Sequence, residues 1–267
     1  MTQPWIAALI AVFVWWFSTG AILLAVRRAD RTGEHALLVL AGLPFLLIGI
    51  AMVAGSLHDF STAGVYQGFL GALAIWGWIE LTFLAGAVTG PMRDAAVPGQ
   101  DGQARFLRAF AALAYHEALL LAGLFGLAIA SQGALNRMAL STYMVLFLAR
   151  ICAKLNLFYG VPRINTEFVP ARLTHLKSYF RQGPITLAFP IAITVLTALF
   201  AACAQNLWTA GTETRAVGFA LLTALTGLAL LEHWLMVIPL PDAKLWRWML
   251  PAPQTQDNSK KARPHGF

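Results

Sequence analysis

The sequence predicts an all-α membrane protein, a polytopic transmembrane helix bundle of about seven spans. Of its 267 residues, 58% are hydrophobic and only 12% are charged, whereas about 25% of the residues in a soluble domain are charged. The mean hydropathy is +0.66. Since one span takes about 20 apolar residues, seven spans with short loops use most of the chain. We therefore expect a single transmembrane domain over residues 1–250 and no separate soluble domain.

Seven apolar runs are each long enough to cross a bilayer. The first is too long for the core of a signal peptide and lacks a small-residue cleavage site, so we expect it to remain as a helix. The fifth is interrupted by Arg150, Lys154 and Asn156. The predicted spans are about 5–26, 36–55, 65–89, 109–130, 139–159, 185–205 and 216–238.

The basic residues between these runs alternate in number, which predicts the orientation by the positive-inside rule. The second loop has no Lys or Arg, and the fourth and sixth have only Arg137 and Arg215. The first, third and fifth loops and the tail are rich in them. We therefore expect a periplasmic N-terminus and a cytoplasmic C-terminus. The residues on the rich side are Arg27, Arg28, Arg31, Arg93, Arg105, Arg108, Arg163, Arg172, Lys177, Arg181, Lys244, Arg247, Lys260, Lys261 and Arg263.

Residues 160–184 have the composition of an interfacial segment on the cytoplasmic surface. Leu173, Leu176 and Phe180 recur at helical spacing among basic side chains, which predicts a short helix lying on the bilayer. A second, tryptophan-anchored segment is expected over 244–249. Residues 251–267 are polar and are predicted to be a disordered cytoplasmic tail.

Ionisable side chains inside the predicted spans are costly and mark a pairing or functional site. The helix rise of 1.5 Å per residue places most of them roughly 10–15 Å from the cytoplasmic ends of their spans, so four helices contribute to one polar layer. The layer is predicted to contain Glu80, His116, Glu117, Arg150, Lys154, Asn156, Glu232 and His233.

Three interpretations of this layer remain open. It is a network of buried ion pairs, a metal site, or an axial histidine for a pigment. The metal candidates are Glu80, Glu117, His116, Glu232 and His233. A standard di-metal bundle site uses Glu-x-x-His on one helix face. Here the Glu and His of each pair are neighbours about 100° apart, so only one of each can point at a common centre.

The sequence lacks the motifs of several other functional classes. No phosphate loop, G-x-S-x-G, C-x-x-C or H-E-x-x-H occurs, and Cys152 and Cys203 lie in apolar runs as packing residues. The pI near 9.9 comes from charges flanking the spans, without the basic stripe of a nucleic-acid-binding protein. We expect no nucleic-acid partner.

The stretch from Lys154 to Pro184, KLNLFYGVPRINTEFVPARLTHLKSYFRQGP, is the least lipid-like part of the chain. It resembles the PuhE family of purple phototrophic bacteria, also called photosynthetic complex assembly protein 2. The likeness is carried by three short sequences, which are Gly160-Val161-Pro162, Glu167-Phe168-Val169-Pro170 and Ser178-Tyr179-Phe180. The resemblance implies a role in assembling or maintaining the reaction centre and core light-harvesting complex, in the inner or intracytoplasmic membrane. No catalytic residue can be assigned from this resemblance.

The leading hypothesis is therefore an assembly factor that contacts lipids and binds reaction-centre or core-antenna subunits or other assembly factors. Bacteriochlorophyll or a precursor is its candidate ligand. The rival is a membrane metal enzyme of tetrapyrrole or quinone metabolism, and a small transporter is weaker because no repeat symmetry is visible. Turns at Pro162 and Pro170 shape the predicted partner-binding segment, whose charged residues are Arg163, Glu167, Arg172, His175, Lys177 and Arg181.

Overall fold

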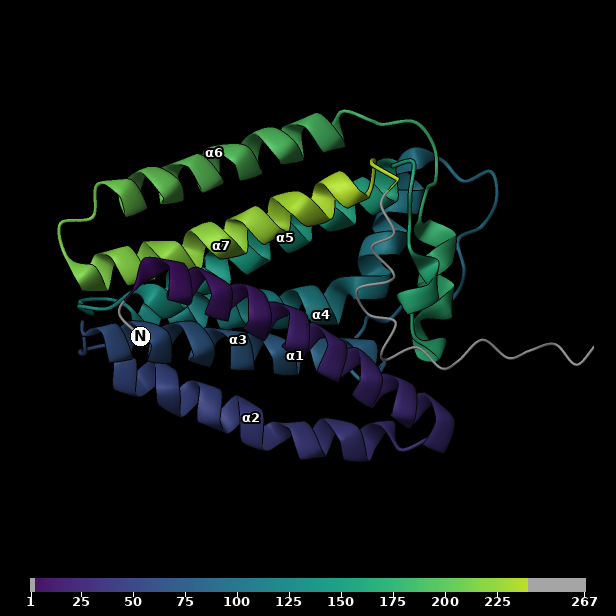
Figure 1. Cartoon of the computed structure of the whole chain (residues 1–267). Coiled ribbons are helices and arrows are strands. Elements are labelled where there is room, and N and C mark those ends of the chain that lie inside the picture. The colour runs from purple at the N-terminus through teal and green to yellow at the C-terminus, as the bar shows by residue number, and fades with distance from the viewer. Residues whose placement is uncertain (1–2, 240–267) are drawn as a thin grey trace, which may run out of the picture.

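A computed structural model describes residues 3–239, and within that range the chain is a bundle of helices (Figure 1). Seven helices are long and apolar enough to span a membrane, which confirms the predicted fold class. The segments expected at 244–249 and 251–267 lie outside the described residues. The spanning helices are α1 (Pro4–Thr32), α2 (His35–Ser56), α3 (Thr62–Leu84), α4 (Gly102–Ala130), α5 (Met138–Tyr159), α6 (Ala188–Trp208) and α7 (Glu213–Leu235).

Helices α3 and α7 form the centre of the bundle. About half of each apolar window is buried inside the protein, whereas 17% of that of α2 is buried. Phe69 of α3 packs against Val217 and Leu221 of α7 in the main apolar cluster. Figure 1 shows α2 and α6 on opposite outer sides, with α1 crossing the central helices. The outer helices therefore leave most of their apolar surface for lipid.

Residues 160–184, which we call the roof segment, lie across the end of the bundle where α3 and α7 finish (Figure 1). They contain two 3-10 helices, η1 (Thr166–Phe168) and η2 (Ala171–Tyr179), the second of which lies where the short amphipathic helix was expected. Leu173 and Leu176, expected to face lipid, are buried against Phe83 and Ala112. The roof segment therefore rests on protein, because its apolar side chains fill the space beyond the end of α3.

That space exists because α3 ends at Leu84, earlier than the predicted run, which extended to 89. Gly86 follows with a φ of 70°, a left-handed conformation that favours glycine. The chain then runs against α4, where the backbone N–H of His116 donates to the carbonyl of Thr89 at 3.0 Å. A Cβ built on Gly90 would lie 2.0 Å from the carbonyl oxygen of Ala111. Only glycine permits this approach.

Candidate functional site

The centre of the polar layer is formed by two ion pairs, both made by α5. Arg150 donates from Nη2 to Oε2 of Glu80 on α3 at 2.6 Å. One turn further along α5, Lys154 donates to Glu117 of α4. Glu80, Glu117 and Lys154 are mostly buried and Arg150 is partly buried, so each charge depends on its partner. The two pairs therefore fix α5 against α3 and α4.

His116 lies beside these pairs without joining them. Its side chain is fully buried and its ring stacks on Phe83, with 4.2 Å between ring centroids and 23° between planes. The Nε2 atom is 3.8 Å from Oε1 of Glu80, too far for a hydrogen bond. Neither ring nitrogen has a hydrogen-bond partner among the described residues. The imidazole is a packed ring between α3 and α4.

Two other members of the predicted layer bond to their own helices. The Nδ1 atom of His233 is 2.7 Å from the carbonyl oxygen of Ala229, one turn back along α7. Asn156 donates its amide to the carbonyl of Cys152 at 3.0 Å. Both side chains are fully buried. They lie at the level of the ion pairs without bonding to them.

The arrangement of the described side chains does not support the metal interpretation. In residues 3–239, no three His, Cys, Asp or Glu side chains are grouped so that they could hold a metal ion. The five candidates are divided instead between separate contacts. Glu80 and Glu117 bond to cations of α5, the two histidines are packed inside the bundle, and Glu232 makes no ion pair with a described residue.

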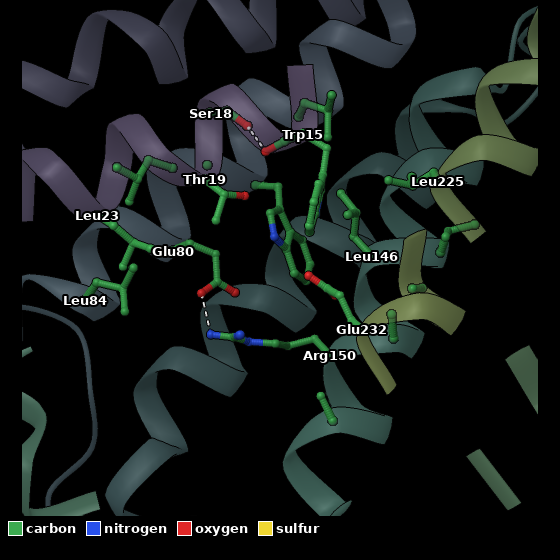
Figure 2. A pocket seen from close by; sticks show the side chains of 18 of the residues that line it. Trp15, Ser18, Thr19, Leu23, Glu80, Leu84, Leu146, Arg150, Leu225 and Glu232 are labelled. Carbon is green, nitrogen blue, oxygen red and sulfur yellow. Dashed lines mark hydrogen bonds and ion pairs between the residues drawn. The ribbon is translucent and has the colours of Figure 1, made fainter. Parts of the chain in front are cut away.

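A cavity of about 340 Å³ lies between α1, α3, α5 and α7 (Figure 2). The ion pair of Glu80 with Arg150 forms part of its wall, and Glu232 extends into it from α7. Glu232 has no ion pair with any described residue. Neither His116 nor His233 is among the lining residues. The cavity therefore brings one unpaired carboxyl group next to one paired one.

Helix α1 completes this cavity with residues that the sequence analysis missed. Trp15, Ser18 and Thr19 lie on its inner wall (Figure 2). The Ser18 hydroxyl donates to the carbonyl of Trp15 at 3.2 Å, which satisfies the hydroxyl within the helix. Adjacent hydroxyl residues in an otherwise apolar run were the available signal, but such residues are common in membrane helices because they bond to the backbone.

A second cavity of about 220 Å³ lies directly beneath the roof segment. Its walls are mostly apolar, with Phe83, Leu113, Phe158 and Leu176 among them. The two cavities share four lining residues, which are Leu84, Arg150, Ala153 and Phe168. The chamber that contains Glu80 and Glu232 and the smaller apolar chamber therefore share a wall that includes Arg150 and Phe168.

The roof segment is fastened to two helices. On one side, Arg27 of α1 donates to the carbonyl of Glu167 at 3.2 Å, and Asp30 accepts from the N–H of Ala171 at 3.2 Å. On the other, Arg105 of α4 donates to the carbonyl of Tyr179 at 2.6 Å. These hydrogen bonds give the segment a defined conformation.

The predicted partner-binding residues fall into two groups on this roof. Glu167, Arg172 and Arg181 are exposed, whereas Arg163, His175 and Lys177 are partly buried. Burial and the nearby Arg93 hold the pKa of His175 below its ordinary value, so its ring is neutral at pH 7. The surface available to a partner therefore centres on the three exposed charges.

Over residues 3–239, fold and site together define a membrane protein with seven candidate spanning helices, a layer of ion pairs and a hydrogen-bonded roof at one end. The chain belongs to the family described as "Protein of unknown function (DUF3623)", whose model matches residues 1–257. It is 49% identical over 254 residues to a protein of Rhodobacter capsulatus named "Uncharacterized 30.4 kDa protein in puhA 5'region", covering 94% of this chain and 93% of the relative. No solved structure matches the chain.

Proposed function

We propose that this protein is an assembly or maintenance factor for the photosynthetic reaction centre and its core light-harvesting complex, the role of the PuhE family. The observation that carries the proposal is the relative named for the puhA 5′ region, which matches almost end to end. Such a gene position fits a photosynthesis gene cluster. The membrane would then be the inner or intracytoplasmic membrane of a phototrophic bacterium.

The roof segment supports a binding role. It presents Glu167, Arg172 and Arg181 to the surroundings, while Leu173 and Leu176 hold it on the bundle. A segment that only touched lipid headgroups would need no such internal anchors. We place contact with a protein partner, a photosystem subunit or another assembly factor, on this exposed face.

A pigment ligand has less support than a protein partner. Axial ligation of bacteriochlorophyll or a precursor needs an accessible imidazole nitrogen, and both His116 and His233 are fully buried. His116 is also covered by Phe83. Pigment binding at either residue would require the bundle to open, so the proposal rests on partner binding.

Deleting the gene is expected to lower the amounts of reaction centre and core antenna while cells still make bacteriochlorophyll. Glu167→Lys and Arg172→Glu should each give the same defect with the protein still present in the membrane, because exposed charges contribute little to folding but much to partner choice. Absorbance spectra of membranes and immunoblots of the protein measure both effects.

Arg215→Glu is the matched control, since Arg215 is exposed at the start of α7, at the opposite end of the bundle. It should leave the photosystem at wild-type levels. Normal photosystem levels in the deletion strain would contradict the proposed role. Accumulation of one pigment precursor without finished bacteriochlorophyll would favour the enzyme hypothesis instead.

We also propose that the roof segment and the C-terminus are cytoplasmic. The basic residues of α1 and of the roof lie at one end, whereas Arg137 and Arg215 lie at the other. By the positive-inside rule, an alkaline phosphatase fusion near Asp59 should be active and a fusion after Lys261 inactive, with green fluorescent protein fusions giving the reverse. Active phosphatase at both positions would overturn this topology.

A further inference from the structure

The charges of the polar layer do not balance. Glu80 and Glu117 each have a cationic partner on α5, in Arg150 and Lys154. Glu232 has none among residues 3–239, although it lies at the level of the ion pairs. The Glu232 side chain is exposed from the protein, at a depth where an ionised carboxylate facing the membrane is costly unless something compensates its charge. No described residue supplies that compensating ion pair.

The surroundings of Glu232 suit a cation brought in by a ligand. Two indoles, those of Trp15 and Trp76, line the same cavity as its carboxyl group. Figure 2 shows Glu232 and Trp15 directed into the space above Arg150. Aromatic faces beside a carboxylate are the usual recognition site for an ammonium group, through cation–π attraction added to charge pairing.

The neighbouring chamber suits an apolar chain. It shares Leu84, Arg150, Ala153 and Phe168 with the lining of the first cavity, and apart from Lys154 its remaining wall is aliphatic and aromatic. Volumes of about 340 and 220 Å³ lie near or below the small end of the 300–1,000 Å³ range typical of ligand sites. A head group with one chain matches them better than a tetrapyrrole with its tail.

We propose that these two chambers form a binding site for a membrane amphiphile with an ammonium head. The head pairs with Glu232 in the cavity that Trp15 and Trp76 line, and the chain passes Leu84 and Phe168 into the space beneath the roof segment. The site is a property of the bundle itself and holds whatever complex the protein assembles.

The test uses full-length protein purified in a neutral detergent and titrated with dodecyltrimethylammonium, with bound molecules counted by native mass spectrometry. Wild-type protein should bind one molecule specifically. Glu232→Gln should weaken binding about ten- to hundredfold, the loss expected when one charge-assisted contact is removed. Glu213→Gln, the same change at the other end of the same helix and outside both cavities, should bind like wild type.

Three further probes separate the contributions of head and chain. Dodecanoate and dodecanol, which carry the chain without the cation, and choline, which carries the cation without the chain, should each bind at least tenfold more weakly. A thermal unfolding curve of unliganded Glu232→Gln should match wild type, which shows that the variant is folded. Equal binding of dodecyltrimethylammonium to Glu232→Gln, or of any of the three probes to wild type, would overturn the proposal.

Discussion

Glu80→Leu should strongly reduce the amount of folded protein, and adding Arg150→Leu to the same chain should restore most of it. The single change leaves the Arg150 guanidinium, whose side chain is 33% exposed, without the carboxylate that it contacts at 2.6 Å. Breaking a fully buried pair from one side costs about 3–5 kcal/mol, and partial exposure of Arg150 lowers that cost. The double change replaces both charges with apolar groups, which is often close to neutral. Membrane accumulation and thermal unfolding in detergent measure the difference.

The second ion pair supplies the control for this experiment. Glu117→Leu with Lys154→Leu should also recover, because these residues contact each other. Glu80→Leu with Lys154→Leu removes the same total charge but takes one residue from each pair, and it should remain as poor as the single changes. Equal recovery in matched and crossed double variants would show that only net charge matters.

Gly90→Ala is expected to destabilise the protein by about 1–3 kcal/mol, the usual cost of overpacking. The added methyl group would lie 2.0 Å from the carbonyl oxygen of Ala111, a backbone atom that moves only with α4 itself. Displacing α4 here also disturbs the hydrogen bond from His116 to Thr89. The midpoint of thermal unfolding in detergent should fall accordingly.

Gly126→Ala is the matched substitution, because Gly126 lies on α4 and its added methyl group would meet nothing within 4 Å. Alanine is the better helix former by about 1 kcal/mol, so this variant should be as stable as wild type or more stable. If the two variants unfold alike, the contact between residues 85–92 and α4 is not a constraint on the bundle.

The number of helices was predictable because hydropathy over about 20 residues is a strong signal. The residues at which the helices end were harder to predict. The run through Gly86 and Gly90 stays apolar, and nothing in composition shows that α3 stops at Leu84. As a result, Leu173 and Leu176 were expected on lipid, although they fill the protein space that this early end creates.

For the site, depth along each helix was computable but rotation about the helix axis was not. The rise per residue placed Glu80, Arg150 and Glu232 at one level. Which carboxylate bonds to Arg150, and which is left unpaired, depends on how the helices pack. The contribution of α1 was missed for the same reason, since Trp15 matters only through the helices that it faces.

The fastening of the roof segment has a consequence for biosynthesis. Its hydrogen bonds to Arg27, Asp30 and Arg105 all involve chain made earlier, so this part can dock as soon as it leaves the ribosome, whereas the bond from the N–H of Arg163 to the carbonyl of Met236 forms only later. Helix α7, which supplies Glu232 and the last wall of the larger cavity, is inserted afterwards. During that interval the cavity is open sideways to the bilayer, and a lipid-soluble molecule can enter before the final helix encloses it.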